Sequence, residues 1–244
     1  MTNAAPDRVL WVTGGGSGMG AAAARAAAAS GWTVVLSGRR VDRLDGVADE
    51  IRQAGGSADV LPLDAADREA VVAAAATLTA RHGRLDGLVL AAGLNAPERR
   101  WDDQSVDGFR AIVDTNLTAV VSVVDAALPA LRASGAGVVV VVSSYAGWSF
   151  QPGAGVAYSA SKTALGSVVR SLNQQEAPHG LRGTHLCPGD VATDFLDQRP
   201  QVPDAAARAV MLTPEDIGRT IGFVLDAPAH VRVDELVISP VAQH

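Results

Sequence analysis

A tyrosine and a lysine four positions apart, Tyr158 and Lys162, have the spacing in this sequence that is best suited to proton transfer. They lie in a stretch predicted to be helical, where residues i and i+4 share one face. A free tyrosine has a pKa of about 10 and is a poor base at neutral pH, but a neighbouring ammonium lowers that pKa. The pair therefore predicts a phenol that acts as an acid or base near physiological pH. The same spacing also occurs on helix surfaces without any function, so other residues must decide between the two interpretations.

Two further segments carry groups that fit the same site. The apolar run that begins at Val138 ends in Ser143 and Ser144. A hydroxyl at the carboxyl end of a strand lies where open α/β sheets bind ligands. We therefore expect Ser144 to hydrogen-bond a substrate carbonyl, with Ser143 as the alternative. Pro188 and Gly189 follow another strand end and are expected on the same rim.

A glycine-rich segment joins the apolar run Val9–Val12 to a helical stretch. Glycines tolerate positive φ and lack the Cβ atoms that would block a pyrophosphate, while a helix N-terminus offers free N–H groups. The spacing fits T-G-x-x-x-G-x-G better than the G-x-G-x-x-G fingerprint. An ordinary tight turn is the alternative, but the strand–turn–helix context favours a nucleotide site. Its expected contacts are Thr13, Gly14, Gly16, Ser17, Gly18, Met19 and Gly20.

The elements that must position these groups alternate along the chain, which predicts an α/β fold with a parallel, doubly wound, Rossmann-type sheet of seven strands. The strands read as continuous apolar runs, which is typical of strands buried on both faces. The predicted strands are Val9–Val12, Thr33–Ser37, Ala58–Leu61, Leu88–Ala91, Val138–Ser143, Arg182–Cys187 and Glu235–Ile238. The predicted helices are Met19–Ser30, Val41–Ala54, Asp67–His82, Asp107–Arg132, Ala157–Glu176 and Pro214–Leu225.

Length and composition are those of one domain covering residues 1–244, with 48% hydrophobic and 19% charged residues. The longest irregular segment, Val191–Met211, predicts a substrate loop or lid at about residues 190–212, because long loops in compact domains are usually functional.

Charge and special residues narrow the function classes. A net charge of −6 disfavours nucleic acid as a partner. The single cysteine, Cys187, cannot form an internal disulfide and is expected to be a buried, inert thiol rather than a nucleophile. The histidines show no metal-ligand spacing, so we expect no metal. The N-terminus lacks the layout of a signal peptide, and no apolar run approaches about 18 residues, so we expect no membrane span and a cytoplasmic location.

Taken together, these motifs resemble the short-chain dehydrogenase/reductase family over nearly the whole chain. The matching strings are Thr13–Gly20, Asp114–Leu117 around Asn116, Ser143–Gly147, Tyr158–Lys162 and Pro188–Thr193. The resemblance implies that Tyr158 exchanges a proton with the substrate oxygen and that Lys162 lowers its pKa and binds the nicotinamide ribose. It implies further that Ser144 orients the carbonyl and that Asn116 holds a water that passes protons to Lys162. It also places Thr193 and the backbone of Val191 at the nicotinamide carboxamide and Asp64 near the adenine.

The sequence departs from the family pattern in two places. The family usually has Asn-Asn-Ala-Gly after its fourth strand, whereas Leu90, Ala91, Ala92 and Gly93 stand here. Backbone contacts at Ala92 and Gly93 are therefore expected to hold the cofactor. Ser144 also precedes Tyr158 by one residue more than is usual, which keeps Ser143 open as the alternative.

The cofactor is predicted from the end of the second strand. An acidic residue there would accept hydrogen bonds from the ribose 2′-hydroxyl and favour NAD. That position is Gly38, and Arg39 and Arg40 follow it. A guanidinium pairs well with a 2′-phosphate, so we expect NADP, with NAD as the alternative.

The substrate is less well defined. Trp148, Phe150 and Phe195, with Leu94 and Leu196, are expected to form an apolar pocket for a ketone or secondary alcohol, although core packing would also explain them. The C-terminal segment Val233–Pro240 is similar to a subgroup that includes NADP-dependent 3-hydroxy acid dehydrogenases. The family resemblance implies a homo-oligomer, a tetramer or a dimer.

Three other classes remain to be weighed. A non-catalytic nucleotide-sensing protein on the same fold would be expected to have a damaged tyrosine–lysine pair, and here the pair is intact. A nucleotide-sugar epimerase would usually carry a longer substrate domain. A metal hydrolase lacks the histidine spacing that a metal would need.

Overall fold

A computed structural model describes residues 8–243 of the chain. Met1–Asp7 and His244 lie outside the described residues, so the expectations for the polar N-terminus and for His244 are not addressed by the structure.

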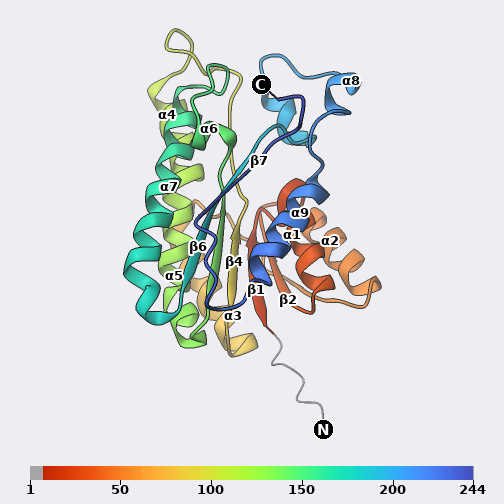
Figure 1. The fold of residues 1–244 in the computed structure, drawn as a ribbon, viewed down its shortest axis with the longest axis vertical. Helices are drawn as coiled ribbons and strands as arrows, with labels where there is room; N and C mark the ends of the chain where they lie inside the picture. Colours follow the sequence, from red (N-terminus) through yellow and green to blue (C-terminus); the bar gives the residue numbers. More distant parts are fainter. Residues whose placement is uncertain (1–7, 244) are drawn as a thin grey trace.

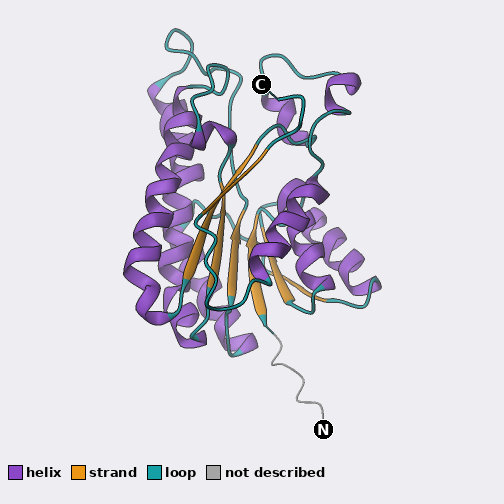
Figure 2. Cartoon of the chain, viewed as in Figure 1, coloured by secondary structure: helices purple, strands orange, loops and turns teal. Residues whose placement is uncertain are grey.

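One seven-stranded, fully parallel sheet forms the centre of the fold, in the order β3-β2-β1-β4-β5-β6-β7. Figure 2 shows it as a single layer of strands between two groups of helices. This confirms the predicted Rossmann-type α/β fold, and every predicted strand is present. The strands are β1 (Val9–Thr13), β2 (Thr33–Ser37), β3 (Ser57–Val60), β4 (Gly87–Leu90), β5 (Val138–Val142), β6 (Arg182–Pro188) and β7 (Glu235–Ile238).

Three long helices cover each face of the sheet (Figure 1). One face carries α1 (Gly18–Ala29), α2 (Val41–Gln53) and α9 (Pro214–Leu225). The other carries α3 (Arg68–His82), α5 (Ala119–Ser134) and α7 (Val156–Glu176). The short elements are α4 (Val106–Val113), α6 (Tyr145–Trp148), α8 (Ala205–Arg208), the π turn Asp114–Thr118 and the 3-10 turns Ala177–His179 and Asp194–Gln198.

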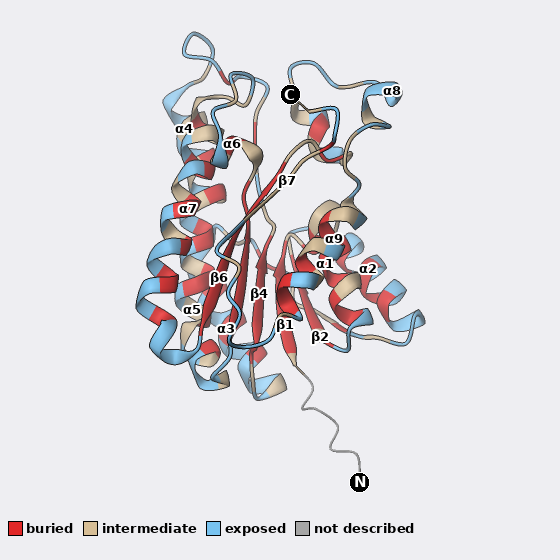
Figure 3. Cartoon of the chain, viewed as in Figure 1, coloured by how far each residue is buried: buried red, intermediate tan, exposed pale blue. Residues whose placement is uncertain are grey.

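The core is split by the sheet into two apolar clusters, because successive side chains of a strand point to opposite faces. On β1, Leu10 and Val12 join the cluster under α1 and α9, whereas Val9 and Trp11 join the cluster under α3 and α5. Figure 3 shows the central strands buried along their length, in agreement with their continuous apolar sequences.

The predicted helix Asp107–Arg132 is a rod of three parts, in which the π turn Asp114–Thr118 joins α4 to α5. This rod, Val106–Ser134, is long and apolar enough to cross a membrane by length and composition, with a mean hydropathy of 1.5. That finding differs from the expectation that no segment would reach this threshold. In the fold, apolar side chains of the rod, Val123 and Leu131 among them, pack in the core against the sheet.

The strand order reverses between β1 and β4, and this switch point is where open α/β sheets bind ligands. Because all strands are parallel, their carboxyl ends share one edge, which is the upper edge in Figure 1. The loops that follow β1, β2, β4, β5 and β6 therefore meet there, and they carry nearly all the predicted site residues.

Candidate active site

A cavity of about 1250 Å³ opens at the carboxyl edge of the sheet. It exceeds the roughly 300–1,000 Å³ that is typical of a site for one small ligand, so a dinucleotide and a second small molecule fit together. Nearly all the residues predicted from the sequence line it. These are Thr13, Gly14, Gly16, Ser17, Gly18, Met19, Gly20, Arg39, Arg40, Asp64, Ala92, Gly93, Ser144, Tyr158, Lys162, Pro188, Gly189, Val191, Thr193 and Phe195.

The glycine turn is packed so closely that side chains are excluded. A Cβ at Gly14, where φ is +69°, would lie 2.7 Å from the Ala92 nitrogen. A Cβ at Gly20 would lie 2.3 Å from the Gly14 carbonyl oxygen. A Cβ at Gly18 would lie 3.3 Å from the Thr193 methyl, so the segment after β6 lies over the turn. The turn therefore forms a cradle whose surface is backbone, as a pyrophosphate site requires.

The start of α1 leaves its first N–H groups without a side-chain cap. Ser17 is the N-cap residue, but its Oγ accepts a hydrogen bond from Arg40 Nη2 at 3.1 Å and caps nothing. Uncapped N–H groups and the positive end of the helix dipole favour an anion at this position. The residues present thus fit the phosphates of a dinucleotide.

The end of β2 carries positive charge. Gly38 stands where an acid would be needed for NAD, and the exposed side chains of Arg39 and Arg40 line the cavity. Asp64 lies after β3 and its Oδ1 accepts from the Ala66 nitrogen at 3.0 Å. This end of the cavity therefore combines two guanidinium groups with one carboxylate.

The tyrosine–lysine pair lies on one face of α7, as its spacing predicted. The Lys162 Nζ is 5.7 Å from the centre of the Tyr158 ring and donates to the Val142 carbonyl at 3.0 Å. The lysine is 4% exposed, and burial lowers its pKa to about 8.

The two adjacent serines differ in their contacts. Ser144 lies beside Tyr158, where its side chain acts to lower the pKa of the phenol, and its Oγ accepts from the Ala146 nitrogen at 3.2 Å at the start of α6. Ser143 Oγ donates to the Lys162 carbonyl at 3.0 Å and is buried beneath α7. The geometry therefore brings Ser144, rather than Ser143, to the phenol.

The electrostatics of Tyr158 differ from the expectation. Burial raises its pKa above the ordinary value, and this effect outweighs the hydrogen bond from Ser144 and the charges of Arg199 and Arg99, which lower it. The expectation that Lys162 lowers this pKa stays a prediction, since its ammonium donates to the Val142 carbonyl at 3.0 Å and lies 5.7 Å from the centre of the Tyr158 ring.

Asn116 lies within the π turn and is fully buried. Its Oδ1 accepts from the Leu94 nitrogen at 2.7 Å and its Nδ2 donates to the Leu94 carbonyl at 2.8 Å. Single π turns inside helices occur frequently at functional sites. The side chain of Asn116 thus fixes the loop after β4 beside Lys162, although it does not line the cavity itself.

The predicted aromatic pocket is only partly assembled. The Phe195 ring lies 6.1 Å from the Tyr158 ring and lines the cavity together with Leu94 and Leu196. Trp148 and Phe150 do not line it, and these residues are 50% and 79% exposed. Trp148 packs instead edge-on against Tyr145 at 5.1 Å.

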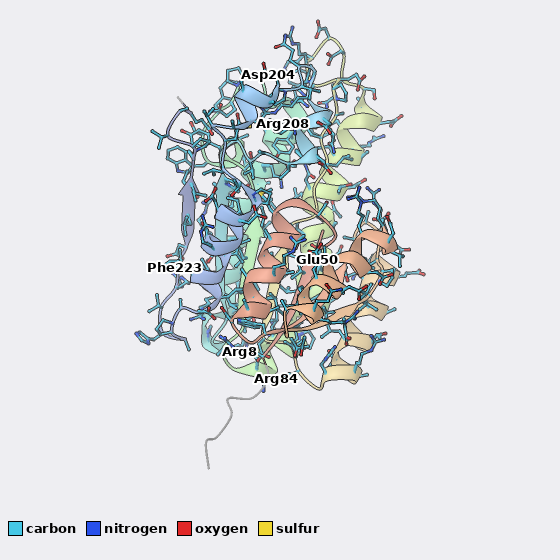
Figure 4. The ribbon with its side chains drawn as sticks, turned by 90° about the vertical axis from the view of Figure 1, so that its right-hand side faces the viewer. Arg8, Glu50, Arg84, Asp204, Arg208 and Phe223 are labelled. Carbon is cyan, nitrogen blue, oxygen red and sulfur yellow. The ribbon has the colours of Figure 1, made fainter. Side chains whose placement is uncertain are left out.

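The predicted lid segment is more ordered than its sequence indicated, with the turn Asp194–Gln198 and helix α8. Arg199 pairs with Asp190 at 2.5 Å, and Arg208 pairs with Asp197 at 2.5 Å. Figure 4 shows Arg208 at the end of the molecule that lies opposite Arg8 and Arg84, over the carboxyl ends of the strands. The ion pairs link parts of the segment to one another, and its first part, which includes Phe195 and Arg199, lines the cavity.

Several polar residues that line the cavity were missed by the sequence analysis. Asn95, Arg99 and Gln198 line the cavity, and the Asn95 nitrogen donates to Gln198 Oε1 at 2.9 Å. They lie in loops with no periodicity or motif, so the sequence offered no signal for them.

A second polar group lies on the face of the sheet beneath α7. The ligand atoms of His185, Cys187 and Glu235 lie within 4.8 Å of one another, a proximity that sequence spacing did not indicate, because β6 and β7 are distant in the chain. His185 Nδ1 and Glu235 Oε2 are 2.9 Å apart and are hydrogen-bonded. Burial raises the pKa of the Cys187 thiol to about 12, which supports the expectation of an inert cysteine.

Comparisons with known proteins agree with this geometry. The family profile described as short chain dehydrogenase matches residues 8–203. A sulfoacetaldehyde reductase of Chromohalobacter salexigens is 34% identical over 240 residues, covering 96% of this chain and 94% of the relative. A glycine betaine reductase of Emericella nidulans is 34% identical over 241 residues, but the chain spans only 19% of its length.

Two solved structures share the fold over nearly the whole chain. An alcohol dehydrogenase of Thermococcus sibiricus in complex with 5-hydroxy-NADP is 31% identical, with a TM-score of 0.87 and coverage of 97% of this chain and 98% of the other. A serine dehydrogenase in complex with NADP+ is 30% identical, with a TM-score of 0.87 and coverage of 97% and 96%.

Proposed function

This chain belongs to the short-chain dehydrogenase/reductase family of NAD(P)-dependent oxidoreductases, and from that premise we propose that it transfers a hydride between NADP(H) and a secondary alcohol or ketone. The observation that carries the proposal is the convergence of Ser144, Tyr158 and Lys162 in one cavity with the glycine turn. Aldehydes belong to the same chemistry, since the relative from Chromohalobacter salexigens is named for reduction of an aldehyde.

NADP is the proposed cofactor. The glycine turn and the uncapped start of α1 suit the pyrophosphate, and Arg39 and Arg40 suit a 2′-phosphate. Val191, Thr193 and Lys162 would hold the nicotinamide end. Similar structures from Thermococcus sibiricus and of serine dehydrogenase contain NADP or a derivative, which supports the choice over NAD. When bound, the cofactor supplies the hydride in reduction and accepts it in oxidation.

The proton step is assigned to Tyr158. In reduction, the phenol donates its proton to the carbonyl oxygen, so the oxygen becomes the hydroxyl of the product alcohol and the phenolate remains. Ser144 donates a hydrogen bond to the same oxygen and orients it. Lys162 and a water held near Asn116 return a proton from solvent to the phenolate. In oxidation, each of these transfers runs in the opposite direction.

Replacing Arg39 by alanine tests the cofactor assignment. A charge-assisted pair with a phosphate contributes about 1.5–3 kcal/mol, so we expect the Kd for NADP to rise at least about tenfold while the Kd for NAD changes less than about twofold. Both constants are measured by quenching of tryptophan fluorescence. An equal loss of affinity for the two cofactors would contradict the assignment. Arg52→Ala, in the last turn of α2 and outside the cavity, controls for loss of a surface arginine.

A non-catalytic nucleotide-sensing protein is the second candidate, because tight cofactor binding alone would also explain the glycine turn. The intact triad of Ser144, Tyr158 and Lys162 favours the enzyme. A screen of alcohols with NADP+ and of ketones and aldehydes with NADPH separates the two. Turnover of at least one compound is expected, and cofactor binding without any turnover would favour the sensing protein.

A further inference from the structure

Arg99 is a buried cation in the active-site cavity to which the mechanism above gives no role. It lies in the loop after β4, is 7% exposed, and lines the cavity together with Tyr158 and Ser144. Arginine is seldom buried to this extent unless a partner compensates its charge. Its partners therefore indicate what it does.

The guanidinium hydrogen-bonds only main-chain carbonyls among the residues that the structure describes. Nε donates to Ala96 at 2.8 Å, Nη1 to Gly153 at 3.2 Å and Nη2 to Gln198 at 2.8 Å. These three carbonyls belong to the loop after β4, the loop before α7 and the lid segment. One side chain thus fastens together the three loops that surround the substrate end of the cavity.

The backbone is shaped for this contact. At Gly155, φ is +98° and a Cβ would lie 2.5 Å from the Arg99 Cβ. The Val156 nitrogen donates to the Arg99 carbonyl at 3.1 Å. The residue is therefore seated against the start of α7, the helix that carries Tyr158.

The positive charge of Arg99 has no counter-ion within 4.0 Å in residues 8–243, whereas two more exposed arginines of the lid segment are paired. Arg199 pairs with Asp190, and Arg208 pairs with Asp197. A buried charge held only by neutral carbonyls is costly. Such a charge becomes favourable when a negative charge forms beside it during the reaction.

The negative charge that forms during the reaction is that of the Tyr158 phenolate, and three charged groups around Tyr158 act on it. Arg199 and Arg99 both lower the pKa of the phenol, and Asp190 raises it. Because Asp190 is paired with Arg199, these two act on the phenol in opposite directions. On Arg99 itself, burial and Arg199 lower the pKa, whereas Tyr158 and Asp103 raise it. Of the two arginines whose charges act on Tyr158, Arg199 is paired with a carboxylate, whereas Arg99 has none within 4.0 Å among residues 8–243. The ammonium of Lys162 lies 5.7 Å from the centre of the Tyr158 ring.

We propose that Arg99 is an electrostatic and positioning residue of the active site, which fastens three loops over the cavity and whose uncompensated charge stabilises the Tyr158 phenolate. The proposal rests on the proposed function only for its consequence in catalysis. When the phenol gives up its proton to a substrate oxygen, the negative charge left on Tyr158 is stabilised by the guanidinium. In the direction of alcohol oxidation, the positive charge of Arg99 lowers the pH at which the Tyr158 phenolate forms.

A direct titration of Tyr158 tests this without any turnover. The chain has two tyrosines, so Tyr145→Phe leaves Tyr158 as the only phenol. The near-ultraviolet phenolate absorbance of this variant is followed against pH with NADP+ bound. Adding Arg99→Gln is expected to raise the titration midpoint by about one pH unit, and Arg99→Lys is expected to return it close to the parent value. An unchanged midpoint in Arg99→Gln would overturn the proposal.

A second variant changes the charge near Arg99 without removing the three hydrogen bonds that Arg99 donates to main-chain carbonyls. Gln198→Glu places a carboxylate next to the main-chain oxygen that Arg99 binds, while its side chain can still accept from the Asn95 nitrogen. It is expected to raise the midpoint in the same direction as Arg99→Gln. Arg110→Gln, an exposed arginine on α4, serves as the control and is expected to leave the midpoint unchanged.

Kinetics separate the electrostatic role from a purely structural one. In alcohol oxidation, the acidic limb of the pH profile of kcat/KM is expected to move upward with the titration midpoint in Arg99→Gln and to return in Arg99→Lys. A structural role alone would lower kcat in both variants without moving the limb. If no alcohol or carbonyl compound is turned over, the proposed function fails, and the titration still decides the role of Arg99.

Discussion

Replacing Tyr158 by phenylalanine is expected to lower kcat/KM by at least about 10³-fold, while NADP binding changes little. The variant loses the hydroxyl to which we assign the exchange of a proton with the substrate oxygen. The ring keeps its packing against Phe195, so the cavity should keep its shape. Steady-state rates are compared with the Kd for NADP and with the melting temperature, which report separately on chemistry, cofactor binding and folding.

The pH dependence of the parent enzyme follows from the direction of the Tyr158 pKa. Burial raises this pKa, so the phenol is protonated over a wider pH range than a free tyrosine. Reduction needs the neutral phenol and should decline only as pH rises through the raised pKa. Oxidation needs the phenolate and should increase over the same interval. In the Tyr158→Phe variant, the decline of reduction and the rise of oxidation with pH should both disappear. If the residual turnover of this variant keeps the same pH dependence, another group is responsible for it.

Replacing Gly20 by alanine is expected to produce the second large effect, a loss of at least about 100-fold in NADP affinity and a drop in unfolding free energy of about 1–3 kcal/mol. The added Cβ would lie 2.3 Å from the Gly14 carbonyl oxygen, which is backbone and cannot rotate away. Either the turn or α1 must shift, and both form the expected pyrophosphate cradle. Fluorescence quenching by NADP and thermal unfolding measure the two effects.

Gly46→Ala is the matched control, because it makes the same change in an exposed helical position. No atom lies within 4 Å of a Cβ added at Gly46 in α2. Alanine is a better helix former than glycine, so this variant should be more stable by roughly 0.5–1 kcal/mol and should bind NADP as the parent does. Equal losses of NADP affinity and stability in the two variants would show that close packing at the turn does not explain why glycine stands at position 20.

The central strands of the sheet could be predicted from sequence because they are buried on both faces. Continuous apolar runs such as Val138–Val142 have few competing interpretations, and the predicted boundaries lie within one residue of the observed strands. The glycine turn and the Tyr158–Lys162 spacing were equally informative, because each depends on local geometry: positive φ in one case and one helical turn in the other.

Features that depend on tertiary contacts were not predictable. The π turn around Asn116 differs from α-helix by one hydrogen-bond register, and no residue type marks it. The pKa of Tyr158 depends on burial and on Arg99 and Arg199, which come from loops distant in the chain. Trp148 was expected in the cavity because it is aromatic and close to Ser144 in sequence, but its direction is set by α6, which was not predicted.

The transfer of a deuteride from labelled cofactor to product tests the central claim most directly. NADPH carrying deuterium at both C4 positions of the nicotinamide is incubated with the enzyme and a ketone that the screen has identified, and the alcohol is analysed by mass spectrometry. We predict one deuterium on the carbinol carbon with the parent enzyme and no product above background with Tyr158→Phe. Unlabelled alcohol, or undiminished labelled product from the Tyr158→Phe variant, would contradict the account.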